Sequence, residues 1–262
     1  MNKGEDTCQD FLDLLQIDEE IKGTFPDLSN ILSKTPKMDA VYPLNSQPVS
    51  LCLIINNVDF TSFPVKRGSD KDAQSLAEVF SELGFRVLMC KNQIKEQMEQ
   101  MLTWFSSLTD PALPQEFRVE EWSGAGFTEP QQLVNHGDAF ICCVLSHGVK
   151  GAVLGTNKIP LIIKHITRTF RATEQSALKG KPKVFLIQAS QGCQSVDPAE
   201  DNCGGGSIPL EADVLVAIAA AEGFLAFRHK TDGNWFIQSV CQQLKERCLR
   251  GEDLLTILQH VK

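Results

Sequence analysis

Two apolar segments of the chain end directly in residues that can take part in nucleophilic catalysis. Residues 139–145 run into Ser146-His147-Gly148, and residues 184–188 run into Ala189-Ser190-Gln191-Gly192. A histidine can serve as a general base near neutral pH, and a serine hydroxyl becomes a nucleophile when such a base takes its proton. A glycine beside them lets backbone N–H groups approach a developing oxyanion closely. The pattern indicates acyl-transfer chemistry if the fold brings the two segments together.

The plainer interpretation is a loop histidine and an ordinary turn serine, and position at a strand end alone favours it. A Ser-His-Asp triad is not indicated, because the sequence places no evident carboxylate to orient His147. The case for catalysis therefore needs more than these two residues.

The elements that must position both loops alternate between strand and helix. Predicted strands cover 50–58, 85–90, 139–145, 184–188 and 213–221. Predicted helices cover 94–105, 162–170, 235–248 and 253–261, and another begins with Ser69 as its N-cap and ends at Gly84. This alternation predicts an α/β fold with a mostly parallel twisted sheet and helices on both faces. Ligands of such sheets bind outside the carboxyl ends of the strands, where both loops would lie.

Composition narrows the functional classes. The 262 residues carry 25 Lys+Arg and 33 Asp+Glu, a net charge of -8, which argues against a nucleic-acid partner. The apolar runs are shorter than the roughly 20 residues of a membrane span, and no signal peptide is recognisable. The 9 cysteines form no CxxC pairs, which is typical of reduced thiols in a cytoplasmic protein rather than disulfides or a metal site. Glycines 148, 151 and 155 do not form a dinucleotide-binding motif, so no cofactor is expected.

Three segments interrupt the regular pattern. Residues 1–46 are punctuated by prolines and predict a leader or linker of low order, with a helical extension as the alternative. Residues 109–134 contain prolines and glycines and predict a long loop or insertion. Residues 191–207 form a polar, glycine-rich stretch that we expect to be exposed and cleavable. The rest predicts one domain.

The segment Gln188-Ala189-Ser190-Gln191-Gly192, with His147 upstream, resembles the caspase nucleophile signature QAC[RQG]G at every position but the cysteine. Longer segments in the family's order extend the resemblance from residue 41 to residue 261. The chain is thus similar to the caspases, cysteine peptidases that cleave after aspartate, and closest to the death-receptor initiator caspases eight and ten. The longer segments include CLIINN (52–57), GSDKDA (68–73), ICCVLSHG (141–148), GKPKVFLIQAS (180–190), IPLEAD (208–213), FRHKTDGNWFIQSVC (227–241) and DLLTIL (253–258).

The resemblance implies a catalytic role for three positions. His147 corresponds to the catalytic histidine and Gly148 to the oxyanion-hole glycine. Ser190 stands at the position of the catalytic cysteine. The pKa of a free thiol is about 8.5, and a nearby imidazolium lowers it further. A serine instead needs an oriented base to take its proton. We therefore expect little or no peptidase activity from the chain as it stands.

The resemblance also implies a pocket for the substrate aspartate, made by two arginines and a glutamine. Gln188 and Arg228 match two of them. The first arginine falls on Lys66 or, with a shift of one residue, on Arg67; a lysine would keep a point charge but lose the guanidinium fork. Two aromatic residues match the walls of neighbouring subsites, with core packing as the alternative: Phe227 and Trp235.

The same resemblance divides the chain as the family does. Residues 47–190 correspond to the large subunit, 191–207 to the intersubunit linker of a zymogen, and 208–262 to a small subunit whose last strand is absent. Without that strand we expect a weakened dimer of the caspase-like three-layer fold. Three aspartates are processing candidates or else exposed turn residues: Asp39, Asp197 and Asp201.

Two functional hypotheses follow. The chain is a caspase-type endopeptidase of apoptotic signalling, with Ser190 introduced deliberately to hold it inactive. Alternatively it is a natural caspase-like pseudoenzyme that regulates other caspases by binding them. Expected partners are aspartate-containing protein substrates and other caspases, including a second copy of the chain.

Overall fold

The apolar runs of the sequence form the parallel strands of one sheet. These strands are β1 (Leu51–Asn56), β2 (Arg86–Lys91), β5 (Phe140–Leu145), β9 (Lys183–Gln188) and β10 (Val214–Ile218). Every residue of β1, β5 and β9 is buried, as expected for strands covered on both faces. The computed structural model describes residues 42–60, 66, 68–108, 114–130, 133–171, 176–192, 213–221, 224, 226, 228–229 and 232–261.

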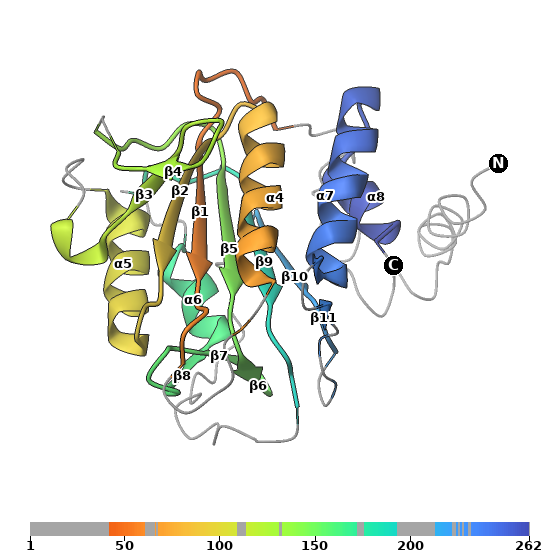
Figure 1. Ribbon diagram of the computed structural model, residues 1–262. Coiled ribbons are helices and arrows are strands. Elements are labelled where there is room, and N and C mark those ends of the chain that lie inside the picture. The colour runs from red at the N-terminus through yellow and green to blue at the C-terminus, as the bar shows by residue number, and fades with distance from the viewer. Residues whose placement is uncertain are drawn as a thin grey trace, which may run out of the picture. The chain divides into compact units, whose positions relative to one another are not determined.

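The strand order is β10-β9-β5-β1-β2-β3-β4 (Figure 1). All pairings from β10 to β2 are parallel, whereas β3 (Glu120–Trp122) and β4 (Phe127–Thr128) add an antiparallel hairpin beside β2. The mostly parallel α/β sheet predicted from the sequence is confirmed.

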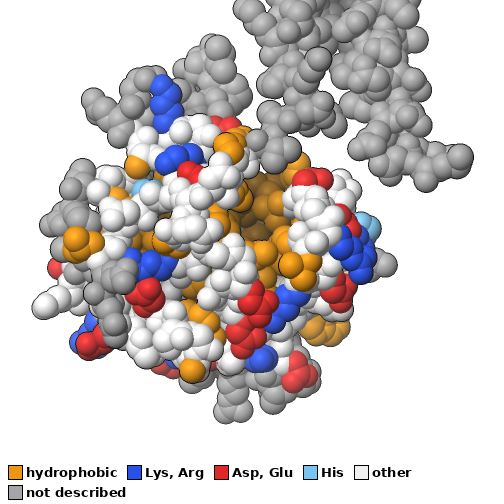
Figure 2. All heavy atoms as spheres, turned by 90° about the horizontal axis from the view of Figure 1, so that it is seen from above, with side chains coloured by type: hydrophobic (Ala, Val, Ile, Leu, Met, Phe, Trp, Pro, Cys, Tyr) orange, Lys and Arg blue, Asp and Glu red, His pale blue; other side chains and the backbone are white. Residues whose placement is uncertain are grey.

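Helices cover both faces of this sheet. On one face lie α4 (Ser69–Glu82), α7 (Trp235–Arg247) and α8 (Leu254–Gln259), whose apolar side chains share a core cluster with Ile54 and Leu186. On the other face, α5 (Lys95–Ser107) and α6 (Ile163–Thr169) pack with Leu53 and Phe185 (Figure 1). The alternating side chains of each strand therefore feed two separate cores. Seen from the top of Figure 1, hydrophobic side chains lie in a hollow of the surface, with polar and charged side chains beside it (Figure 2).

One prediction about the first helix was wrong. Ser69 is the first residue of α4 rather than its N-cap; Gly68, with a φ of 84°, takes the cap position. The Ser69 hydroxyl instead donates to Asn56 Oδ1 (2.6 Å) and ties the helix to the end of β1. The helix ends before Gly84, whose φ is also 84°, as the sequence predicted.

The segment 109–134, predicted as a long loop or insertion, contains regular structure within its described part. It holds the 3-10 helix η1 (Gln115–Phe117) and the β3–β4 hairpin. The hairpin is tied to β2 because Arg86 forms a bidentate pair with Glu121 (2.7 and 2.8 Å) and also donates to the backbone oxygen of Leu133. The strands are too short for a sequence period to reveal them.

Several other short strands and a 3-10 helix were not predicted from the sequence. A three-stranded antiparallel sheet follows the SHG segment, and a two-stranded ladder precedes α7. Their members are β6 (Gly148–Val149), β7 (Ala152–Leu154), β8 (Pro160–Ile162), β11 (Arg228–His229), β12 (Gly233–Asn234) and the 3-10 helix η2 (Cys248–Arg250).

The described cysteines are free thiols, and most lie in the core. Burial raises the pKa of Cys142 and Cys143 well above the ordinary value, so both remain protonated. Within the described ranges, no group of three or more His, Cys, Asp or Glu side chains could hold a metal ion. In the same ranges, no helix has the length and apolarity that a membrane crossing requires.

His136 gives the fold a specific sensitivity to acid. Burial lowers its pKa from 6.5 to about 4, although Nε2 donates to the backbone oxygen of Phe105 (2.6 Å) and that bond opposes the shift. Between pH 6.5 and about pH 4, the His136 imidazole is protonated in the unfolded chain but neutral in the folded chain. Stability is therefore expected to fall as the pH drops through this window, by up to about 1.4 kcal/mol per pH unit.

The test compares urea unfolding of the parent and His136→Gln at pH 7 and pH 5. Because carboxylates also titrate at low pH, the difference between the two proteins is the informative quantity. The parent should lose about 2 kcal/mol more than the variant over this interval. An equal loss in both would contradict the assignment.

Candidate active site

The loop that begins at residues 146–148 (the SHG loop) and the loop of residues 189–192 (the ASQG loop) leave the sheet at the same level. Leu145 pairs with Asn56 on one side and with Gln188 on the other. Just beyond this row, the Ser146 N–H donates to the backbone oxygen of Gln188 (3.0 Å). The parallel register therefore delivers both loops to the carboxyl edge of the sheet, where the sequence expects the chemistry.

Gly148 lies directly against the second loop. A Cβ at this position would lie 2.6 Å from the Ser190 backbone oxygen and 2.7 Å from the Ala189 Cβ. It would also lie 2.8 Å from the backbone oxygen of Ala152. Contacts this short require a residue without a side chain, so the close approach of the two loops depends on glycine.

The two proposed reacting side chains lie on these adjoining loops, and both are half-buried. The His147 ring meets Phe60 edge-on, with 4.7 Å between the ring centroids. The Ser190 hydroxyl accepts a hydrogen bond from the Ala226 N–H (3.4 Å), which contacts it from the C-terminal part of the chain. The His147 ring is thus held by its contact with Phe60. The Ser190 oxygen lies between its own loop and the segment that contains Ala226.

A buried cation lies beside the same loop. Lys66 and Gln188 are only 2% and 3% exposed. The Lys66 ammonium donates to the Gln188 side-chain oxygen and also to its backbone oxygen (3.5 Å). The Lys66 backbone is fixed by hydrogen bonds with Val58 (3.0 Å) and Ser69 (3.3 Å). Two of the sequence-predicted pocket residues therefore touch, because the Lys66 ammonium donates to the Gln188 carboxamide.

The remaining pocket candidates belong to the C-terminal part. Arg228 lies in β11, with its backbone paired to Asn234. Trp235 begins α7 and is 65% exposed, so the alternative of core packing is wrong for this residue. The other candidates lie outside the described residues: Arg67, Phe227, Asp39, Asp197, Asp201 and the Arg228 side chain.

Gln191 is a structural residue of the site that sequence reasoning did not single out. Its side-chain oxygen accepts from the Gly151 N–H (2.9 Å), and its own N–H donates to the backbone oxygen of Phe224 (2.9 Å). Lys150 N–H donates to the backbone oxygen of Gly192 (3.2 Å). These bonds fix the loop just after Ser190. The only signal in the sequence was that Gln191 belongs to the signature.

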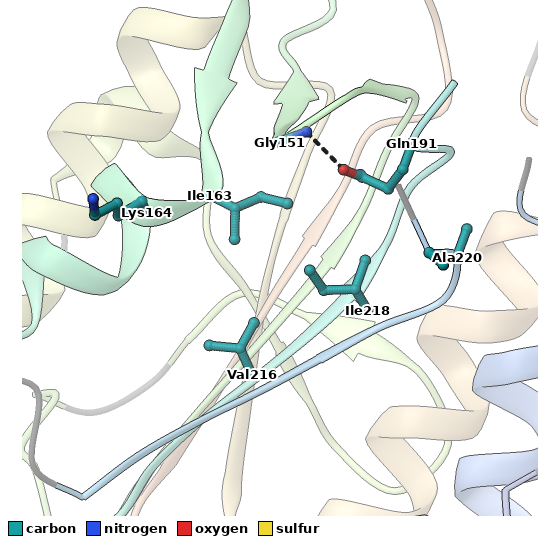
Figure 3. A pocket seen from close by; sticks show the side chains of 8 residues that line it. Gly151, Ile163, Lys164, Gln191, Val216, Ile218 and Ala220 are labelled. Atoms are coloured by element: carbon teal, nitrogen blue, oxygen red, sulfur yellow. Dashed lines mark hydrogen bonds between the residues drawn. The ribbon is translucent and has the colours of Figure 1, made fainter. Parts of the chain in front are cut away.

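A cavity of about 580 Å³ is lined by Gln191 and by residues of β10 and α6. Figure 3 shows Ile163, Val216 and Ile218 directed toward one another around it. Neither His147 nor Ser190 lines it. Among the described residues that line it, Lys164 is the only charged one, and neither candidate reacting side chain is present. These described lining residues are Gly151, Ile163, Lys164, Gln191, Val216, Ile218, Ala220 and Ala221.

Comparison with known proteins identifies the fold family. A family model described as "Caspase domain" matches residues 49–115 and 127–262. This chain belongs to the caspase family. The caspase domain is 32% identical to caspase-8 of Rattus norvegicus over 255 residues, which cover 87% of this chain and 48% of that protein. It is 34% identical to caspase-10 of Homo sapiens over 221 residues, covering 80% of this chain and 38% of that protein.

A third relative of this caspase domain is caspase-3 of Felis catus, 34% identical over 217 residues that cover 79% of this chain and 69% of that protein. The chain spans about half the length of the caspase-8 relative. The family model leaves a gap between its two matched stretches, from 116 to 126, and strand β3 of the additional hairpin lies in this gap. Strand β4 (Phe127–Thr128) lies within the second matched stretch, so only the first half of the hairpin falls outside the match.

Proposed function

We propose that this chain is a caspase-type endopeptidase domain that cleaves peptide bonds after aspartate in apoptotic signalling, with its activity suppressed by Ser190. The observation that carries the proposal is the close packing of Gly148 on Ala189 and Ser190, beside the buried Lys66–Gln188 pair. A nucleophile position, an oxyanion-hole glycine and a carboxylate pocket then occupy one edge of the sheet.

In the proposed reaction, the side chain at position 190 attacks the carbonyl carbon of the bond after aspartate. The backbone N–H groups of Gly148 and residue 190 stabilise the oxyanion, and His147 takes the proton of the attacking group and donates it to the leaving amine as the C–N bond breaks. A water molecule then hydrolyses the acyl-enzyme and frees the side chain of residue 190. A thiolate attacks with little help, whereas a serine must lose its proton during attack to an oriented base. The sequence places no evident carboxylate to orient His147, so Ser190 is expected to react slowly.

The slow reaction makes the chain as it stands suitable for a binding experiment. A peptide ending its recognition sequence in aspartate should bind at least about tenfold more tightly than the same peptide with asparagine, because the carboxylate gains a charge-assisted bond to Lys66. Fluorescence anisotropy with a labelled peptide measures both dissociation constants. Lys66→Met should remove most of the difference.

Lys164→Met provides the matched control, since it removes a lysine that lines the other cavity. Arg228→Ala should weaken binding of the aspartyl peptide as well. Equal affinity for the two peptides in the parent would refute the carboxylate pocket. A preference for aspartate that survives Lys66→Met and Arg228→Ala would refute the residues assigned to it.

A second candidate function is that of a caspase-like pseudoenzyme that regulates other caspases by binding them. Ser190 and Lys66 favour it, because each replaces a residue that the active family uses. The relevant experiment is a pull-down with purified caspase catalytic domains, combined with an activity assay of the captured enzyme. Binding that changes the partner's activity, together with an inactive Ser190→Cys variant, would favour this candidate over the first.

The remaining assignments are also proposals. We infer cytoplasmic location from the reduced thiols, and cleavage at Asp39, Asp197 and Asp201 from their positions relative to the family's processing sites. The same reasoning gives a dimer with a second copy or another caspase, in which the free side of β10 is the expected contact.

A further inference from the structure

Asp72 is a fully buried carboxylate that connects helix α4 with β12 and α7 in the C-terminal part of the caspase domain. It lies in the first turn of α4 and has 0% exposure. Its two oxygens accept from the Asn234 N–H (2.8 and 3.0 Å), and Oδ1 also accepts from Gln238 Nε2 (2.8 Å). Both donors lie in the C-terminal part, on β12 and α7. A charge buried this deeply depends on such hydrogen bonds.

The backbone that Asp72 holds is the partner of the strand that carries Arg228. In the β11–β12 ladder, Asn234 pairs with Arg228 and Gly233 pairs with His229. The packing is close, since a Cβ on Gly233 would lie only 2.2 Å from Asp72 Oδ1. The carboxylate therefore touches the backbone of β12 directly.

Asn234 also determines where α7 begins. Its side chain accepts from the Ile237 N–H (3.2 Å) and caps the helix. The Asn234 N–H thus donates to Asp72, its side chain caps α7, and its backbone pairs with that of Arg228. A displacement of the Asn234 backbone would move the ladder and the start of the helix together.

We infer that Asp72 is a positioning residue for the substrate-aspartate pocket, acting through Asn234 to hold the strand that carries Arg228. The inference rests on the proposed function for its effect on substrate. Its structural part, that Asp72 orders the β11–β12 ladder, can be tested without any ligand.

The first test is hydrogen exchange on the full chain. Asp72→Ala should reduce the protection of the backbone amides of 228–229 and 233–234 by at least about tenfold, while β1 and β5 keep theirs. Asp70→Ala is the matched control, because Asp70 lies on the same helix but pairs with Lys91 (2.7 Å) and Asn56 (2.8 Å) instead. Unchanged protection of the ladder in Asp72→Ala would overturn the inference.

The second test uses the Ser190→Cys background and an aspartyl peptide reporter. Asp72→Ala should raise KM by about tenfold or more and change kcat less, because the substrate carboxylate loses a well-placed arginine. Asp72→Asn keeps one acceptor oxygen for Asn234 and should rescue most of the loss. Gln238→Ala, which removes only the helix contact, should leave KM close to that of the background.

The outcomes separate the two claims. An unchanged KM in folded Asp72→Ala would mean a purely structural role and would overturn the inference. If Asp72→Ala does not fold, Asp72→Ser takes its place in both tests: an unchanged KM together with unchanged protection of the ladder in that variant would overturn the inference. If the background shows no preference for aspartate, the proposed function fails, and hydrogen exchange alone decides whether Asp72 orders the ladder.

Discussion

Replacing Ser190 by cysteine is expected to raise the rate of cleavage after aspartate by about a thousandfold or more. The physical reason is that a thiol with a pKa of about 8.5 is partly ionised near neutral pH, and more so beside an imidazolium, whereas a serine hydroxyl is not. The change is nearly isosteric, and the Ser190 oxygen already lies on a loop fixed by Gln191 on its C-terminal side. The backbone donors should therefore stay in place.

The measurement is steady-state cleavage of a fluorogenic aspartyl peptide by the purified chain. A kosmotropic salt such as sulfate is added, because it favours association of copies by strengthening apolar burial. Ser190→Ala serves as the control for residual activity without a nucleophile. A cysteine variant no more active than Ser190→Ala would count against the endopeptidase proposal and favour the pseudoenzyme.

The second large effect is expected from Gly148→Ala in the Ser190→Cys background. The new Cβ would lie 2.6 Å from the backbone oxygen of residue 190 and 2.8 Å from that of Ala152. Backbone atoms cannot yield as a flexible side chain can, so the two loops must separate and the Gly148 N–H loses its alignment. Loss of one oxyanion donor costs about 100- to 1,000-fold in kcat.

The matched control is Gly126→Ala in the β3–β4 hairpin. A Cβ there meets nothing within 4 Å, and the position has no positive φ. Thermal unfolding of both variants checks that the sheet remains intact. If Gly148→Ala keeps the kcat of the background, the close packing of the two loops has no catalytic meaning and the oxyanion assignment is wrong.

The parts of the fold that could be predicted are those in which many residues share one environment. Strands β1, β5 and β9 are buried on both faces, so nearly every residue is apolar and the run is visible in the sequence. The β3–β4 hairpin could not be predicted, because its strands have three and two residues and are only partly buried. Its stability comes from the non-local pair of Arg86 with Glu121, which no local pattern encodes.

The candidate site was predictable where chemistry and sequence order coincide. His147, Gly148 and Ser190 stand at strand ends within recognisable segments, and parallel pairing then requires a common edge. The choice between Lys66 and Arg67 could not be made from the sequence, because it depends on which residue turns inward. The contact of buried Lys66 with Gln188 is the arrangement that the lysine alternative requires. Asp72 and Gln191 could not be identified, because they act on backbone N–H groups brought near only by folding.

The β3–β4 hairpin has a consequence for how copies of this sheet can add to one another. On the hairpin side the edge strand is only two residues long, which offers a very small template for another strand. On the opposite side, the edge strand β10 is five residues long. No strand among the described residues pairs with its outer edge. For the described part of the sheet, we therefore expect strand addition at β10 and not at the hairpin. Two such sheets that join through β10 use up the productive edge of each, so the assembly ends as a closed pair and does not propagate into a fibre.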